Sequence, residues 1–164
     1  MPFTPFHFGP GALIHSAAPQ HISFLAFCGA NVLVDVEPLY FMLTDQYPIH
    51  RFFHTYIGAT VAAAIVVAIF ALAHGVVPRL LDQLGLRKLS VRAVALGAFA
   101  GTYSHVLFDS LMHADMEPFA PFSDANPLLG AVFLGTLHGF CLLAGLVGLI
   151  VIGVRYMRKR QVRS

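Results

Sequence analysis

Long apolar runs separated by short polar stretches dominate this chain and predict a bundle of membrane helices. The run 57–77 is long enough to cross a bilayer, which takes ~20 residues of helix, and its only ionisable residue is His74. Two further runs, 93–112 and 128–154, also reach that length. The pattern therefore predicts an all-α, polytopic membrane helix bundle with three clear spans.

The N-terminal part of the chain has a less regular pattern. Residues 1–20 contain four prolines and two glycines, so we expect at most a short apolar half-helix over 12–18, ending at Pro19. The next apolar run, 23–43, is long enough to span, but four residues interrupt it: Asn31, Asp35, Glu37 and Pro38. We therefore predict a broken or re-entrant helical segment buried inside the protein, because irregular backbone survives at membrane depth only where it is buried.

Three polar loops and a tail complete the predicted order, and their basic residues predict the orientation. The loop 78–92, which should turn at Gly85, and the tail 155–164 hold nine of the ten Lys and Arg residues. Both segments should therefore be cytoplasmic, because cytoplasmic loops of membrane proteins are enriched in basic residues. The loops 44–56 and 113–127 then lie outside. For the N-terminus, both an outward and an inward placement remain open.

Composition supports one integral-membrane domain over 1–164. Hydrophobic residues make up 57% of the chain and charged residues 11%, where soluble domains have about 25% charged residues. We therefore expect a multi-pass protein of the cell (inner) membrane whose surroundings are the lipid bilayer. The basic residues are not interleaved with aromatic ones, so no nucleic-acid partner is expected. The sequence makes no prediction of oligomeric state.

Histidine and carboxylate residues gather in the segments predicted to lie near the outer face. His105, Asp109 and His113 are four residues apart, so in a helix they share one face. Imidazole and carboxylate groups at that spacing are suitable ligands for a divalent metal ion. The alternative is a polar helix end at the membrane surface.

Two other regions offer similar groups. His50 and His54 are also four apart, on a helix that we expect to begin at Pro48, but no glutamate of a zinc-peptidase motif lies between them. Asp35 and Glu37 face the same way only if that piece is extended, which Pro38 favours.

The remaining histidines are weaker candidates for metal ligands. His7 could be a ligand if the N-terminus is outside. His138 should lie near the bilayer centre. There a hydrogen bond to a threonine or to a backbone carbonyl is as suitable for its ring as metal binding. His74 is on the cytoplasmic side and is excluded.

Imidazoles and carboxylates without thiolates suggest Zn²⁺, with Mn²⁺ or Fe²⁺ as alternatives. The candidate ligands are His7, Asp35, His50, His54, His105, Asp109 and His113. Because one tetrahedral site uses fewer groups than these, a two-ion site that acts on a phosphoester is one arrangement the set allows.

The segments MPFTPFH, GANVLVDVEP, HRFFHT and SHVLFDSLMHADMEPFAPFSDANPLLG occur here in an order that resembles the membrane-bound metal-dependent hydrolases of the YdjM-like family. That family is distantly similar to the zinc-dependent phospholipase C and single-strand nuclease group. The resemblance implies metal-site roles for His7, for the acids Asp35 and Glu37, for the segment from His50 to Thr55, and for the pair His105 and Asp109. The chain departs from the family at Val34, where the family has proline, and at Glu37, where it has aspartate. Its two histidines are also four apart, where the family more often has five.

Three functions remain open from the sequence. The first is a membrane-embedded metal-dependent hydrolase acting on a lipid or phosphoester, with Glu37 or Asp115 as the catalytic general base. The second is a metal-binding or ion-conducting membrane protein without hydrolysis. The third is a structural subunit whose histidines satisfy one another in a buried network.

Overall fold

The computed structural model describes residues 5–83, 86 and 88–161, and within them all regular structure is helical. The elements are α1 Pro5–Ala17, α2 Phe24–Leu43, the short 3₁₀ helix η1 Phe52–His54, α3 Tyr56–Val76, α4 Pro78–Gln83, α5 Val91–Ser110 and α6 Leu134–Gln161. The predicted turn at Gly85 lies outside the described residues.

Four of these helices are long and apolar enough to cross a membrane: α2, α3, α5 and α6. The predicted all-α membrane bundle is therefore confirmed. The predicted break in the second segment is wrong, because α2 is one continuous helix with Pro38 inside it. Proline is tolerated in membrane helices, where neighbouring groups compensate for the backbone hydrogen bond that it removes.

The N-terminal helix is longer than its composition predicted. α1 begins at Pro5 and continues through Pro10, so the predicted start at residue 12 is seven residues too late. Proline is well suited to the first position of a helix, because its fixed φ is already helical and the N–H that it lacks has no partner there. The helix ends at Ala17, before Pro19, as expected.

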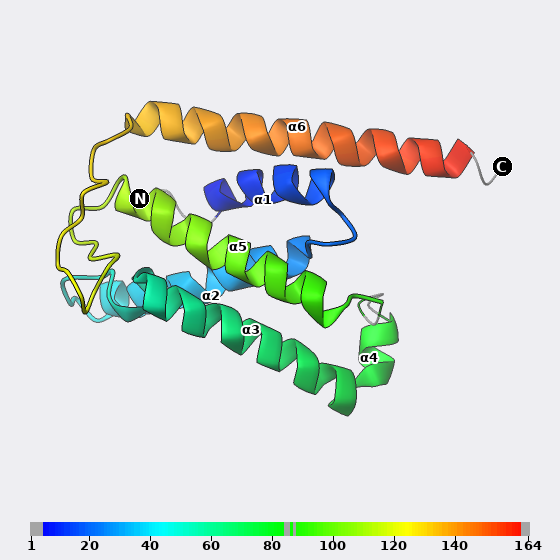
Figure 1. Ribbon diagram of the computed structural model, residues 1–164, viewed down its shortest axis with the longest axis horizontal. Coiled ribbons are helices and arrows are strands. Elements are labelled where there is room, and N and C mark those ends of the chain that lie inside the picture. The colour runs from blue at the N-terminus through cyan, green and yellow to red at the C-terminus, as the bar shows by residue number, and fades with distance from the viewer. Residues whose placement is uncertain (1–4, 84–85, 87, 162–164) are drawn as a thin grey trace.

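The helices pack as an antiparallel bundle with α5 between α2 and α3, and with α1 lying along α6 (Figure 1). Glycines make the contact between α2 and α5 close. A Cβ atom on Gly97 would collide with the backbone carbonyl of Ser23, and one on Gly101 would meet the carbonyl of Phe27 at 2.6 Å. This close approach brings the polar residues of α2 against those of α5.

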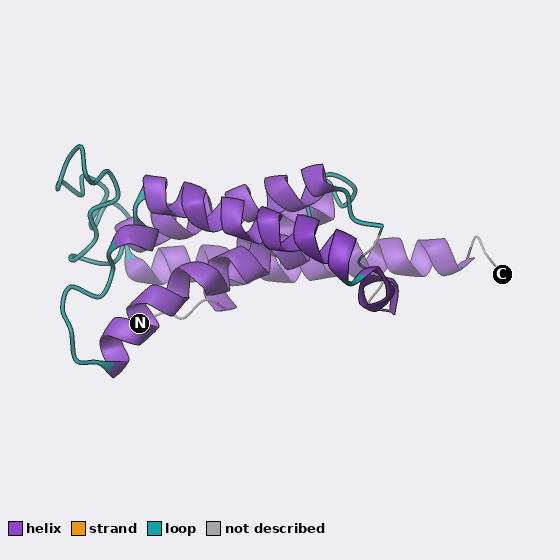
Figure 2. Ribbon diagram, turned by 90° about the horizontal axis from the view of Figure 1, so that it is seen from below, coloured by secondary structure: helices purple, strands orange, loops and turns teal. Residues whose placement is uncertain are grey.

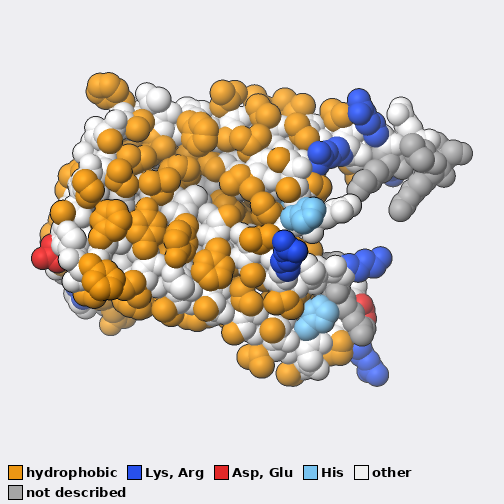
Figure 3. Space-filling model, viewed as in Figure 1, with side chains coloured by type: hydrophobic (Ala, Val, Ile, Leu, Met, Phe, Trp, Pro, Cys, Tyr) orange, Lys and Arg blue, Asp and Glu red, His pale blue; other side chains and the backbone are white. Residues whose placement is uncertain are grey.

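The two ends of the bundle differ in structure and charge. The segments 44–55 and 111–133 form the connections at one end, here called the loop end (Figure 2). α4 and the end of α6 lie at the opposite end, here called the basic end, where Lys and Arg side chains gather (Figure 3). Arg51 is the one described basic residue at the loop end.

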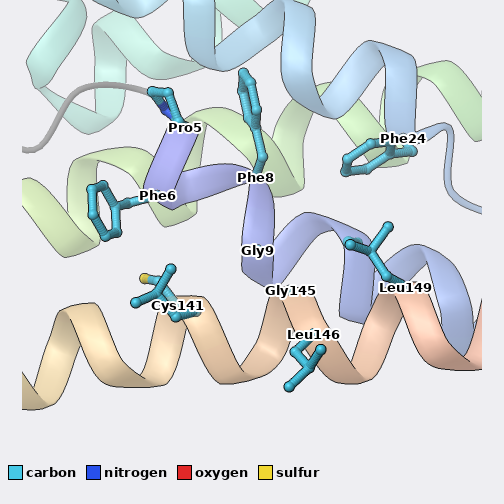
Figure 4. Close-up of a pocket in the computed structure, with 11 residues that line it drawn as sticks. Pro5, Phe6, Phe8, Gly9, Phe24, Cys141, Gly145, Leu146 and Leu149 are labelled. Atoms are coloured by element: carbon cyan, nitrogen blue, oxygen red, sulfur yellow. The ribbon is translucent and has the colours of Figure 1, made fainter.

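An apolar groove of about 440 Å³ runs between α1 and α6 (Figure 4). Phe6 and Phe8 of α1 line it together with Cys141 and Leu146 of α6. The two helices touch where Gly9 passes Gly145, with the Cα of Gly9 at 3.2 Å from the position that a Cβ on Gly145 would take. The side chain of Arg155 donates a hydrogen bond to the carbonyl of Ser16 and ties the far end of α1 to α6.

Candidate metal centre

Side chains from five segments of the chain converge at the loop end of the bundle. They are His7 from α1; Asn31, Asp35 and Glu37 from α2; His50 and His54 from the segment 44–55; His105 and Asp109 from α5; and His113 and Asp115 from the loop after α5. His7, Asn31, His50, His54, His105 and Asp109 are buried.

Four of these residues form a compact group with the geometry of a metal site. Asp35, His54, His105 and Asp109 each offer a ligand atom, and these atoms all lie within 4.8 Å of one another. Nε2 of His105 is 3.2 Å from Oδ1 of Asp35 and 3.2 Å from Oδ2 of Asp109. Nε2 of His54 is 3.5 Å from the same Asp109 oxygen.

Imidazole nitrogens of both histidines in this group lack a hydrogen-bond partner. Nε2 of His54 and Nε2 of His105 are buried, and neither has a partner in hydrogen-bond geometry. Both face carboxylate oxygens, so a positive charge placed among the four groups would satisfy all of them. Two imidazole nitrogens and two carboxylates are a donor set that Zn²⁺, Mn²⁺ and Fe²⁺ accept in proteins. The residues therefore fit a divalent metal ion.

A second group shares one residue with the first. His50, Asp109 and His113 also bring their ligand atoms within 4.8 Å of one another. The rings of His50 and His113 lie 4.3 Å apart between centroids. Asp109 belongs to both groups, so the two candidate positions share its carboxylate.

Two of the histidines have their ring orientation fixed through Nδ1. Nδ1 of His105 lies in hydrogen-bond contact with Oδ1 of Asn31 at 2.9 Å. Nδ1 of His50 donates to Oδ1 of Asp115, also at 2.9 Å. Metal-binding histidines commonly donate their second nitrogen to such an acceptor, which leaves Nε2 as the ligand.

Glu37 holds the loop that carries His54. Its Oε2 accepts hydrogen bonds from the backbone N–H of Arg51 at 3.3 Å and of Phe53 at 2.9 Å, and lies 3.7 Å from Nδ1 of His54. Glu37 was predicted to be a general base, and that role stays a prediction. The contacts give its carboxylate a positioning task.

Asp115 has comparable partners. Its Oδ2 accepts the backbone N–H groups of Ile49 and His50. Burial raises the pKa of Asp115, but the hydrogen bonds from the ring and backbone of His50 outweigh it and hold that pKa below its ordinary value. A carboxylate with a lowered pKa is a weaker base, so this geometry favours an orienting role over the predicted general-base role, which stays a prediction.

Burial opposes positive charge on both imidazole rings of this loop, but the net pKa shifts of the two rings have opposite directions. Burial lowers the pKa of His50, and the neighbouring ring of His54 adds to that effect. Burial also opposes charge on His54, but the carboxylates of Asp109 and Glu37 outweigh it, so the pKa of His54 is raised. His54 therefore lies where positive charge is favoured.

The structure corrects how several predicted residues reach the site. α5 ends at Ser110, so His113 lies beyond the helix and not on the face shared by His105 and Asp109. The helix predicted from Pro48 is replaced by irregular chain and η1, yet the rings of His50 and His54 still meet at 4.7 Å. Asp35 and Glu37 sit on a helix and not on extended chain, and both reach His54.

The structure places His7 beside the first group and His138 away from it. Nε2 of His7 is 3.2 Å from Oδ1 of Asp109, and its ring stacks on that of His105 at 4.2 Å. α6 begins at Leu134 and not at residue 128, so His138 is in the first turns of the helix and not near the bilayer centre. Its ring packs on Phe6 at 4.7 Å.

A pocket of about 380 Å³ opens beside the second group. His50 and Asp115 line it together with Arg51, Thr55 and Glu117. Its volume falls within the range of ~300–1,000 Å³ typical of small-molecule sites. The pocket gives a molecule at the loop end access to His50.

Comparison with known proteins adds no identity to this description. No protein-family model, no curated protein and no solved structure matches the chain. The case for a metal site therefore rests on the geometry of the described side chains.

Proposed function

We propose that the protein is a membrane-embedded, metal-dependent hydrolase whose His/Asp centre opens toward the outer face. The observation that carries the proposal is the group of Asp35, His54, His105 and Asp109, with ligand atoms within 4.8 Å of one another. Burying such a cluster in a membrane bundle costs free energy. Ionisable residues that are nevertheless found inside membrane proteins are usually functional.

Zinc is the ion that this donor set suits best, with Mn²⁺ or Fe²⁺ as alternatives. The first group provides two imidazoles and two carboxylates for one ion. The second group, with His50 and His113, provides a position for another ion through the shared carboxylate of Asp109. If both groups held an ion, the pair would supply the charge stabilisation that two-metal sites give to displacement at phosphorus.

A divalent ion supplies Lewis acidity, which activates water as a nucleophile for hydrolysis. The chain's own residues contribute positioning around it. Glu37 and Asp115 hold His54 and His50 in place, and the pocket beside His50 admits the substrate. We place a lipid or another phosphoester in that pocket, because the site lies at the membrane surface and Arg51, which can pair with phosphate, lines it.

The orientation follows from charge. The basic end, with α4 and the C-terminal part of α6, is proposed to be cytoplasmic in an inner membrane. The loop end then faces outward. The resemblance to the YdjM-like hydrolases supports this proposal. Its motif positions fall on His7, Asp35, Glu37, His50, Arg51, His54, Thr55, His105 and Asp109.

The test is hydrolysis of phospholipid and phosphomonoester substrates by the detergent-purified protein, with zinc added or removed by a chelator. We expect activity that the chelator abolishes, that zinc restores, and that His105→Ala lacks. His74→Ala is the matched control, because His74 lies at the opposite end of the bundle in α3.

Other outcomes would reject hydrolysis and identify an alternative. Protein that binds zinc near stoichiometry but cleaves no phosphoester would be a metal-binding or ion-conducting protein. Well-folded protein that binds no metal would be a structural subunit with a buried histidine network.

A further inference from the structure

Asn31 is a fully buried polar residue in the middle of α2, and the role in metal binding proposed above does not account for it. Its exposed fraction is 0%, and its side chain contacts His105 and the Gly101 position of α5. An amide buried in this way costs free energy unless its donor and acceptor atoms are both bonded. Both ends of the Asn31 amide do have partners.

Those partners fix which way the amide points. Nδ2 donates a hydrogen bond to the carbonyl oxygen of Phe27 at 2.8 Å. A carbonyl only accepts, so this end of the amide must be the nitrogen. Oδ1 therefore faces the ring of His105, with Nδ1 of that ring at 2.9 Å. Since Oδ1 can only accept, Nδ1 of His105 must carry a hydrogen.

We propose that Asn31 is a positioning residue that keeps the hydrogen of His105 on Nδ1 and so presents Nε2 as a ligand to the divalent ion. The Nε2 atom is the one that lies 3.2 Å from both Asp35 and Asp109. The hydrogen bond also fixes the plane of the ring. The proposal rests on the metal site of the proposed function and not on hydrolysis.

The packing of α5 against Asn31 leaves room for this contact. Gly101 of α5 lies against it, and a Cβ atom there would be 3.0 Å from Nδ2 of Asn31 and 2.6 Å from the carbonyl of Phe27. Glycine at this position therefore lets α2 approach α5 closely enough for the amide to reach His105 of α5. The contact joins two helices at the depth of the cluster.

A neutral amide also suits the charge of the site. The carboxylates of Asp35 and Asp109 balance one divalent cation, so the first group is neutral when it holds the ion. A carboxylate at position 31 would accept the same hydrogen bond but would add a buried negative charge, which is costly in a low-dielectric interior. Asn31 orients His105 without that cost.

A simpler role for Asn31 is interhelical adhesion, because buried amides also hold membrane helices together. The two roles predict different results for Asn31→Leu, which keeps the approximate shape but removes the acceptor. Adhesion predicts lower stability with unchanged zinc affinity in the folded fraction. The positioning role predicts that zinc affinity falls by about 10–100-fold, as for other outer-shell partners of metal-binding histidines.

The experiment measures zinc affinity by competition with a chelator, alongside thermal unfolding, for purified full-length protein. Asn31→Asp keeps the acceptor, so we expect it to bind zinc within about threefold of wild type or more tightly, although its metal-free form should be less stable. Thr102→Val is the matched control, since Thr102 is also 0% exposed and its hydroxyl bonds only within α5. It should leave zinc affinity unchanged.

A spectroscopic measurement makes the test independent of how the variants fold. In protein labelled with ¹⁵N-histidine and loaded with zinc, the His105 ring should show zinc on Nε2 and a hydrogen on Nδ1. Zinc on Nδ1, or Asn31→Leu affinity within threefold of wild type, overturns the proposal. If wild-type protein binds no zinc, the proposed function fails. The positioning proposal then fails with it, because it needs the metal site, whereas zinc bound through Nε2 of His105 without any hydrolysis would reject only the hydrolase function.

Discussion

Asp109 is the residue on which both groups of candidate ligands depend. Its Oδ2 faces His54 and His105, while its Oδ1 is buried 3.2 Å from Nε2 of His7. No other residue belongs to both groups. Loss of this one carboxylate should therefore remove metal from both positions, whereas loss of His113 should affect the second position alone.

The corresponding prediction compares Asp109→Ala with His113→Ala. For Asp109→Ala we expect zinc affinity to fall by more than ~100-fold, beyond the ~10–100-fold cost of losing an outer-shell partner. His113→Ala should keep the zinc held by the four-residue group. Elemental analysis of purified protein, with thermal unfolding to confirm folding, measures both. Equal zinc content in the two variants would contradict the shared role of Asp109.

Asp115 joins two loops, and its contribution to stability should depend on pH. Its carboxylate accepts hydrogen bonds from the His50 ring and from two backbone N–H groups, and its pKa is lowered. Because the folded state holds this group ionised, the contribution is present above the unfolded pKa of ~3.9 and is lost as the pH falls through the lower folded value.

We therefore expect Asp115→Asn to lower the free energy of unfolding by about 1.5–3 kcal/mol at pH 7, the cost typical of hydrogen bonds to charged groups. The difference from wild type should shrink as the pH falls below about 4, where the Asp115 carboxyl of the unfolded chain takes up a proton before that of the folded protein does. Thermal unfolding in detergent from pH 7 to pH 3 measures this. Identical curves for the two proteins at pH 7 would show that the contact contributes nothing.

At the residue scale, the sequence could predict many of the candidate ligands that the structure brings together, but not the residues that orient them. His105 and Asp109 are recognisable because a four-residue spacing within one helix determines that they share a face. Asn31 gives no comparable signal, since its partner is 74 positions away and the contact depends on how closely α2 and α5 approach. The roles of Glu37 and Asp115 in holding the loop 44–55 are equally invisible in the sequence, because they depend on hydrogen bonds from backbone N–H groups of that loop.

At the scale of the helices, close contacts depend on glycines that face the backbone of the neighbouring helix. In α6, a Cβ on Gly148 would lie 2.6 Å from the carbonyl carbon of Ala12 in α1, whereas Gly153 has open space. This difference allows a matched comparison on one helix. It tests whether α1, which carries His7 to Asp109, is held by close packing on α6.

We expect Gly148→Ala to lower the free energy of unfolding by about 1–3 kcal/mol, as overpacking does, because the added methyl group has backbone in its way. Gly153→Ala should be neutral or stabilising by up to ~1 kcal/mol, since alanine favours helix over glycine. Thermal unfolding in detergent compares the two. A Gly148→Ala protein as stable as Gly153→Ala would contradict the close α1–α6 contact.

Element boundaries show where sequence patterns are informative. The spans were predictable because ~20 apolar residues in a row leave few alternatives to a membrane helix. α1 was underestimated because its prolines suggested irregular chain, while its packing on α6 supports a helix. The first residues of the last apolar run form a loop, so hydrophobicity alone misplaced the start of α6 and the depth of His138.

At the scale of the whole molecule, the titratable cluster and the basic residues are at opposite ends of the bundle. The two loop-end connections carry His50, His54, His113 and Asp115, while α4 and the end of α6 carry most of the described Lys and Arg residues. The four candidate spans, α2, α3, α5 and α6, are even in number, so α6 ends at the same end of the bundle at which α2 begins. This separation predicts one orientation in the membrane.

The orientation can be tested with single cysteines, after Cys28 and Cys141 are replaced by alanine. Ser123→Cys lies in the exposed part of the loop-end connection, and Gln161→Cys lies at the exposed end of α6. In intact cells a membrane-impermeant thiol reagent should label position 123, and position 161 should react only after the membrane is opened. This follows from retention of basic segments on the cytoplasmic side. The reverse pattern would place the metal centre on the cytoplasmic face and exclude a substrate that arrives from outside.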